Sequence, residues 1–433
     1  MNNTKKKSPI SWVPTAYFAM GLPFVVLNMV TVLMFKGLEV DDKLITFWTS
    51  LILLPWTLKP LWSPFLELFR TKKFFVIVTQ LITGVTFGLV AFALNLSHFF
   101  SISIALLAIV AFSGATHDIA CDGVYMSELS NEDQAKFIGW QGAFYNIAKI
   151  LATGGLVYLA GYFIELNADA GLLTANKRAW MIILLILSVT MILLGIYHLF
   201  ALPSTQSASS KKTLRSNKEV MKELGQVLMD FFRKTHITYY ICFIILYRFA
   251  EGFVMKIVPL FLKADREMGG LGLNEKEIGL YYGTYGAAAF VLGSLLAGYY
   301  IARKGLKKTI FSLCCIFNLP FMVYALFAYF QPESGWIICS GIVFEYFGYG
   351  FGFVGLSLFM MQQVAPGKHQ MAHYAFASGI MNLGVMLPGS ISGFVSDALG
   401  YKAFFIFTMF ATIPAFLITY FVPFTYPDEK KNQ

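Results

Sequence analysis

The stretch LEVDDKLITFWTSLILLPWTLKPLWSPFLELFRTKK, residues 38–73, has a counterpart in LNEKEIGLYYGTYGAAAFVLGSLLAGYYIARKGLKK, residues 273–308. Both stretches are 36 residues long, begin with acidic residues, continue through an apolar run and end in a basic cluster. Self-similarity at this distance indicates an internal repeat. The sequence therefore predicts a chain built from two related halves.

The composition places these halves in a membrane. Of the 433 residues, 57% are hydrophobic and only 13% are charged, and the mean hydropathy is +0.64. Soluble proteins carry roughly a quarter of charged residues. A helix that crosses a bilayer needs about 20 apolar residues, and runs of this length fill most of the chain. We expect an all-α membrane protein without a large soluble domain.

Apolar runs separated by charged residues, glycine or proline predict twelve transmembrane helices, six in each half. They are expected at residues 11–34, 44–64, 74–95, 100–126, 135–164, 179–201, 237–262, 277–301, 309–330, 335–361, 371–396 and 402–424. The predicted organisation is an N-terminal half over residues 1–202, a linker over 203–236 and a C-terminal half over 237–433. The linker is charged and includes a predicted amphipathic helix from Lys218 to Phe232.

The loop charges predict the orientation. With the N-terminus in the cytoplasm, the inside loops carry 21 Lys and Arg residues and the outside loops carry 8. Such a bias in short loops is typical of cytoplasmic loops, so both termini are expected in the cytoplasm. Because the net charge of +9 is explained by topology, a nucleic-acid partner is not expected.

Eight ionisable residues fall inside predicted helices. The cations are Lys59, Lys149, Arg248 and Lys256, and the acids are Asp118, Asp122, Glu251 and Glu345. A charge at the bilayer centre costs at least about 2.5 to 3.5 kcal/mol, so such residues are functional or paired by default. This set is the candidate site.

In the N-terminal half, Asp118 and Asp122 are four residues apart and share a helix face. Two carboxylates this close favour protonation of at least one of them, which a proton-coupling site requires. The alternative is that they pair with Lys59 and Lys149 and stabilise the fold.

In the C-terminal half, the spacing of Arg248 and Glu251 favours an intrahelical pair. Lys256 lies two turns beyond Arg248, where a side chain that reaches the lipid interface is the alternative to a functional role. Glu345 stands in a glycine-rich apolar stretch with no cation within a helical turn on its own helix. It is the leading candidate for reversible protonation in this half.

Signatures of enzymes and metal sites do not stand out in the sequence. There is no phosphate-binding loop, nucleophile elbow or HExxH motif, and the six histidines lack metal-ligand spacing. The five cysteines all fall in apolar runs. We expect neither enzymatic activity nor a cofactor or metal.

Several motifs resemble those of AmpG-type muropeptide permeases and acetyl-coenzyme A transporters of the major facilitator superfamily. They are KPLWSP at 59–64, ATHDIACDG at 115–123, YRFAE at 247–251 and FEY at 344–346. The resemblance implies a two-half fold with a substrate site at the membrane midplane. It also implies proton-driven import of GlcNAc-anhydromuropeptides across the bacterial inner membrane.

Six residues look like matches to charged positions of the family, namely Lys59, Asp118, Asp122, Arg248, Glu251 and Glu345. Two departures bear on the substrate. His117 stands where the family commonly has Gln, and Asn146 stands where it tends to have Arg, with Lys149 one turn later. A neutral or different amino sugar therefore stays open as the substrate.

The predicted function is proton-coupled import of a muropeptide or related amino-sugar saccharide. The expected partners are this small molecule, protons and the lipid bilayer. Substrate contacts are expected from Lys59, His117, Asn146, Lys149, Arg248 and Lys256, and proton coupling from Asp118, Asp122, Glu251 and Glu345. The alternatives are transport of a simple sugar or an acyl-coenzyme A compound, and a membrane receptor that transports nothing.

Overall fold

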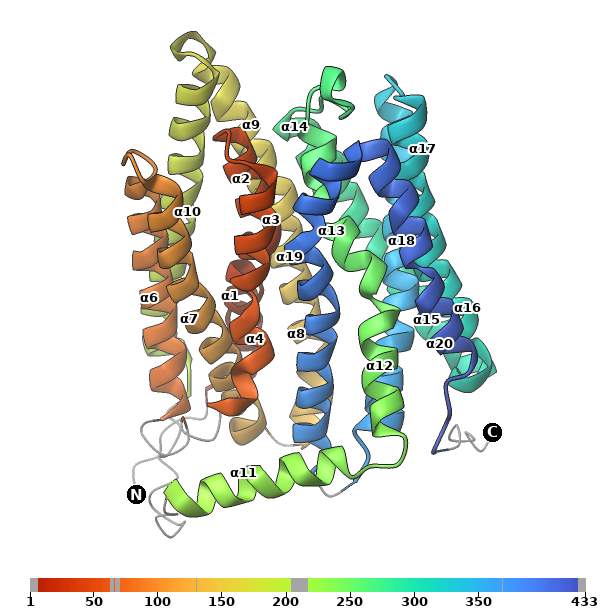
Figure 1. The fold of residues 1–433 in the computed structure, drawn as a ribbon. Coiled ribbons are helices and arrows are strands. Elements are labelled where there is room, and N and C mark those ends of the chain that lie inside the picture. The colour runs from red at the N-terminus through yellow and green to blue at the C-terminus, as the bar shows by residue number, and fades with distance from the viewer. Residues whose placement is uncertain are drawn as a thin grey trace. The chain divides into compact units, whose positions relative to one another are not determined.

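A computed structural model describes residues 7–62, 66, 71–129, 131–203, 217–367 and 369–426. Every regular element in these ranges is a helix (Figure 1). Several positions used in the sequence argument lie outside the described residues, namely Lys5, Lys6, Ser63, Pro64, Arg70, the linker residues 204–216, Lys368, Lys430 and Lys431.

Contacts divide the chain into two units, one formed by Met1–Val40 with Ile52–Val220 and the other by Asp41–Leu51 with Met221–Gln433. The boundary near residue 220 falls inside the predicted linker. Residues 41–51, expected in the N-terminal half, group with the second unit. The predicted domain limits otherwise stay a prediction.

The first unit consists of helices that range from 5 to 30 residues in length. Within it, α6 packs against both α7 and α10, and α1 packs against α8 (Figure 1). Its helices are α1 (Val13–Val25), α2 (Thr31–Gly37), α4 (Leu54–Leu58), α6 (Lys72–Ala93), α7 (Phe99–Glu128), α8 (Asn131–Ile150), α9 (Val157–Leu166) and α10 (Leu172–Ala201).

The second unit begins with α3 and continues from the linker to the C-terminus. The predicted amphipathic linker helix is confirmed as α11. The helices are α3 (Asp42–Leu51), α11 (Asn217–Phe232), α12 (Ile237–Tyr247), α13 (Phe249–Lys263), α14 (Glu275–Ile278), α15 (Ala287–Lys304), α16 (Leu306–Asn318), α17 (Met322–Phe330), α18 (Gly335–Phe359), α19 (Gln370–Ala411) and α20 (Ile413–Tyr420).

Among the described residues, nine helices are long and apolar enough to cross a membrane. The difference from the twelve predicted segments has three local causes. The segment 44–64 is divided between α3 and α4, and the segment 237–262 is divided at Arg248, so neither contains one long helix. The last two segments run together as Ala372–Tyr420, although Gly400, with a φ of 71°, is not helical. Each predicted segment thus corresponds to helical structure.

The packing of α3 on α19 depends on a glycine. The Gly393 N–H donates to Thr46 Oγ1 at 3.2 Å, and Lys43 Nζ lies 2.7 Å from Asp397 Oδ2 one turn further along α19. A Cβ atom at Gly393 would stand 2.7 Å from the Asp42 carbonyl oxygen. The two backbones therefore approach to a distance that only glycine allows.

Replacing Gly393 by Ala is expected to destabilise the protein by about 1 to 3 kcal/mol because the added methyl group overpacks this contact. The control is Gly298→Ala on α15, where a Cβ atom would meet nothing within 4 Å. There the substitution should be neutral or stabilise, since Ala favours helix over Gly by up to about 1 kcal/mol. Thermal unfolding of the purified protein in detergent compares the two. Equal stability of both variants would show that α3 is not held at Gly393.

Candidate substrate and proton-coupling sites

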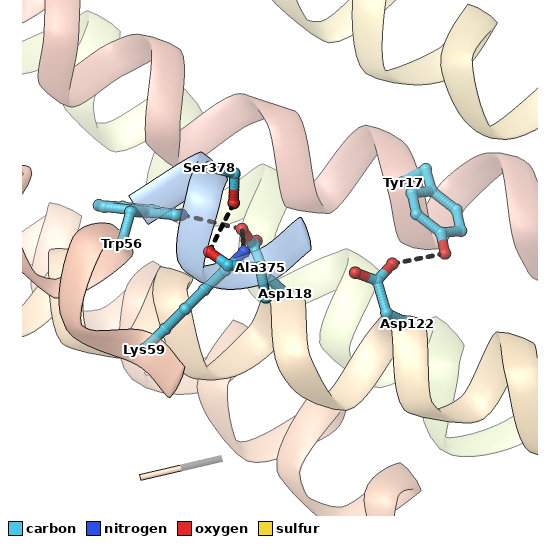
Figure 2. Close-up of polar contacts among 7 residues, drawn as sticks. All are labelled: Tyr17, Trp56, Lys59, Asp118, Asp122, Ala375 and Ser378. Atoms are coloured by element: carbon cyan, nitrogen blue, oxygen red, sulfur yellow. Dashed lines mark hydrogen bonds and ion pairs between the residues drawn. The ribbon is translucent and has the colours of Figure 1, made fainter. Parts of the chain in front are cut away.

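The acidic pair of the first unit lies on α7. Asp118 Oδ2 accepts a hydrogen bond from Trp56 Nε1 at 2.9 Å and lies 3.6 Å from Lys59 Nζ, while Asp122 Oδ1 accepts from the Tyr17 hydroxyl at 2.8 Å (Figure 2). Asp118 and Lys59 thus form an ion pair. Such a pair was the alternative to a coupling role for these carboxylates. The two carboxylates have different partners, so they are chemically distinct.

Local sequence explains how Trp56 and Lys59 reach Asp118. Pro55 stands in the first turn of the short helix α4, and Lys59 begins a 3-10 turn that includes Pro60. Proline is favoured at the start of such helices because its fixed φ suits the first turn. On α7, a Cβ atom at Gly114 would come within 2.7 Å of the Trp56 ring. The glycine leaves the space that the indole occupies.

The two oxygens of Asp118 are not equivalent. Both contacts described above use Oδ2, whereas Oδ1 is buried and has no hydrogen-bond partner in the part of the chain that the structure describes. A proton added to Oδ1 would therefore displace no existing contact. This arrangement suits a carboxyl group that gains and loses a proton.

The other predicted residues of this unit lie on α7 and α8. His117 is buried and its Nε2 lies 2.9 Å from Gln80 Nε2 on α6. Asn146 and Lys149 are half-buried on α8, and Asn146 Nδ2 donates to the Gly142 carbonyl one turn earlier. The structure thus brings Lys59 to Asp118, and it turns His117 toward α6.

In the second unit, the predicted pair of Arg248 and Glu251 is confirmed. Arg248 Nε and Nη2 each donate to one carboxylate oxygen of Glu251 at 2.5 Å, and both side chains are buried. The pair sits at the break between α12 and α13, and Glu251 lies in the first turn of α13. An acid is favoured there by the helix dipole. The guanidinium carbon also lies 5.3 Å from the centre of the Phe353 ring.

The alternative for Lys256, a side chain that reaches the lipid interface, is wrong. Lys256 is only 1% exposed, and its Nζ lies 3.4 Å from both the carbonyl oxygen and the hydroxyl of Thr49 on α3. The sequence did not reveal this contact because α3 is about two hundred residues away in the chain. Lys256 is therefore a buried cation, as a functional or structural role requires.

Glu345 is buried on α18 and accepts a hydrogen bond from the Tyr324 hydroxyl at 2.9 Å. This tyrosine lies on another helix, α17, so the sequence did not reveal the contact. Buried tyrosines usually direct the hydroxyl to a partner, and this is the only signal that was available. The same reasoning applies to Tyr17 and Trp56 in the first unit.

Comparison with known proteins agrees with this architecture. The family model described as Major Facilitator Superfamily matches residues 15–366 and 240–433. The chain belongs to the Major Facilitator Superfamily, and it is a multi-pass membrane transporter.

Among its relatives, the anhydromuropeptide permease of Escherichia coli K12 is 22% identical over 409 residues, which cover 93% of this chain and 77% of the permease. The putative transporter AmpG 1 of Rickettsia bellii is 24% identical over 385 residues, which cover 85% of this chain and 87% of that protein. The resemblance to AmpG-type permeases is thereby confirmed.

Solved structures share the fold at lower identity. A D-xylose-proton symporter superposes with a TM-score of 0.72 and 12% identity, covering 96% of this chain and 98% of the symporter. The nucleoside transporter NupG gives a TM-score of 0.72 at 14% identity, covering 96% and 99%. These neighbours support the two-half transporter fold.

Proposed function

We propose that this transporter imports a GlcNAc-anhydromuropeptide, or a closely related amino-sugar saccharide, together with protons. The observation that carries the coupling is the Asp118 carboxyl group, whose contacts within the described residues use Oδ2 and leave Oδ1 open to a proton. The names of the AmpG-type relatives support the substrate class.

The buried cations favour an anionic group on the substrate. Arg and Lys inside a membrane domain commonly mark a substrate path, and a muropeptide carries carboxylates. We assign substrate contacts to Lys59, His117, Asn146, Lys149, Arg248 and Lys256, and proton coupling to Asp118, Asp122, Glu251 and Glu345. The Arg248–Glu251 pair has the strongest contacts of this set, so its structural role is tested separately below.

The proposed location is the bacterial inner membrane with both termini in the cytoplasm. The charge bias of the loops supports this orientation. Import then brings the substrate from the periplasm and draws on the inward proton gradient.

Replacing Glu345 by Gln is expected to preserve substrate exchange while abolishing accumulation driven by a pH gradient. Gln resembles the protonated acid and still offers an oxygen to the Tyr324 hydroxyl, but it cannot release a proton. Exchange is measured by counterflow of radiolabelled GlcNAc-anhydromuropeptide in proteoliposomes, and accumulation in the same vesicles with an imposed gradient.

The matched control is Glu267→Gln, the same substitution at an exposed residue. It should leave both activities unchanged. If Glu345→Gln still accumulates substrate at the wild-type rate, Glu345 is not a coupling acid, and Asp118 becomes the next residue to test.

A further inference from the structure

Four polar side chains from four helices of the first unit form a continuous buried line. Thr15 Oγ1 on α1 lies 2.9 Å from His198 Nε2 on α10, and His198 Nδ1 lies 2.9 Å from Gln80 Oε1 on α6. Gln80 Nε2 then lies 2.9 Å from His117 Nε2 on α7. Of the four residues, Gln80 and His198 are fully buried and only Thr15 is half-exposed.

The amide of Gln80 fixes which ring nitrogens carry hydrogen. Its oxygen can only accept and its nitrogen can only donate. His198 Nδ1 must therefore carry a hydrogen, whereas His117 Nε2 must be bare. With both rings neutral, His198 Nε2 is bare as well and accepts from the Thr15 hydroxyl.

One proton can be added to this line without the loss of a hydrogen bond. His198 Nε2 takes the proton and becomes the donor to Thr15 Oγ1. The Thr15 hydroxyl then turns to the carbonyl oxygen of Trp12, which lies 3.2 Å away. After this change, every atom of Thr15, His198 and Gln80 that made a hydrogen bond in the neutral line still makes one.

A second proton does not fit. A charged His117 would direct its Nε2–H at Gln80, and the charged His198 already directs its Nδ1–H there. The amide has only one oxygen, so it cannot accept both hydrogen bonds. A buried donor without an acceptor costs about 1 to 3 kcal/mol, and more when it is charged. Rotation of the amide by 180° would not move the proton to His117 at equal cost, because the added proton would sit on His117 Nδ1, which is buried without a hydrogen-bond partner among the described residues. The line therefore holds one proton, on His198.

The position of the line gives the proton a way out, because Thr15 lies near the N-terminus, which we place in the cytoplasm. Thr15 is the third residue of α1, and His198 lies in the last turn of α10, so both are near helix ends. Gln80 is eight residues beyond the start of α6, about 12 Å into the helix at 1.5 Å per residue. His117 immediately precedes Asp118. The line thus extends from half-exposed Thr15 to His117, the residue that precedes Asp118.

Other titratable groups lie on the same four helices. Lys73 is on α6 and donates to the Leu202 carbonyl at the end of α10, and the Tyr197 ring lies against His198. The further titratable groups on these helices are Tyr17 on α1, Lys72 on α6, Asp118, Cys121, Asp122, Tyr125 and Glu128 on α7, and Lys177 and Arg178 on α10.

We propose that His198, Gln80 and His117 form a second proton-binding site of this unit, which carries one proton per transport cycle in addition to the acidic residues. This inference rests on the proposed proton coupling. It assigns Gln80 as the positioning residue that keeps the two histidines from being charged at once, and Thr15 as the exit for the proton.

The test is the proton stoichiometry. In proteoliposomes with the membrane potential clamped at zero, the logarithm of the accumulation ratio of radiolabelled GlcNAc-anhydromuropeptide rises with the pH difference, and the slope equals the number of coupled protons. His198→Gln, which keeps a hydrogen-bonding amide but cannot be charged, should lower this slope by one. Gln80→Met removes the oxygen that accepts from His198 Nδ1, and it should also lower the slope by one.

Thr83→Val is the matched control, since it deletes another buried hydrogen bond of α6, that from Thr83 to Ser113 at 3.0 Å. Its slope should equal that of the wild type. An unchanged slope in either histidine-line variant overturns the proposal, and so does a failure of both variants to reach the membrane folded, which would make the line structural. A wild-type slope of zero would instead overturn the proposed proton coupling itself.

Discussion

Asp118→Asn is expected to lower uptake of radiolabelled GlcNAc-anhydromuropeptide by about 100-fold, a change equal to about 2.7 kcal/mol at 1.36 kcal/mol per factor of ten. Asn still offers an oxygen to Trp56 Nε1, so the local packing is retained. It can neither take up nor release a proton, and it leaves the half-buried Lys59 without its carboxylate. Initial rates in membrane vesicles, normalised to the amount of folded protein, measure the effect.

The matched control is Asp397→Asn, which removes the carboxylate of an ion pair with Lys43. The Asp397 side chain is 59% exposed, compared with 12% for Asp118. Exposed ion pairs contribute about 0 to 1 kcal/mol, so this variant should transport within a few-fold of the wild type. If Asp118→Asn retains a third or more of wild-type uptake, Asp118 does not couple transport to protons.

Arg248→Ala is expected to destabilise the second unit by about 3 to 5 kcal/mol because it leaves the carboxylate of Glu251 buried without its cation. The sequence predicted a substrate contact for Arg248 as well as a pair with Glu251. The two 2.5 Å hydrogen bonds between these buried side chains indicate that the pair also stabilises the fold. Abundance in the membrane and thermal unfolding in detergent measure the loss.

The double variant Arg248→Met with Glu251→Leu separates stability from transport. Apolar residues of similar volume often replace a buried ion pair without loss of stability, so the double variant should be folded and as abundant as the wild type. It should nevertheless fail to take up substrate if these residues act in transport. A double variant as unstable as the single one would show that the pair is not the source of the instability.

Much of the fold could be predicted because each membrane helix is encoded by a local apolar run. The same local reasoning predicted the Arg248–Glu251 pair. Its members are three residues apart in the sequence, so their contact can be predicted without knowing which helices lie beside them. It also singled out Asp118 and Lys59, since charges in apolar runs stand out in the sequence.

The contacts that complete the site were not predictable in this way. Tyr17, Trp56 and Tyr324 resemble ordinary membrane aromatics, and their partners lie on other helices. The break between α3 and α4 adjoins Pro55, a local signal that the prediction of one segment over 44–64 overlooked. The break at Arg248 stands in the sequence YRF, where no glycine or proline marks it. The contact between His198 and Gln80 could not be predicted either, because 118 residues separate them in the chain.

The most direct test of proton-coupled muropeptide import uses the wild-type protein alone. Proteoliposomes are given an alkaline interior, and the internal concentrations of radiolabelled GlcNAc-anhydromuropeptide and D-xylose are followed with and without a protonophore. We expect the muropeptide to accumulate above its external concentration, the protonophore to abolish this accumulation, and D-xylose to equilibrate only. Muropeptide accumulation that does not depend on the pH gradient would contradict proton coupling. Accumulation of D-xylose but not of the muropeptide would contradict the assigned substrate.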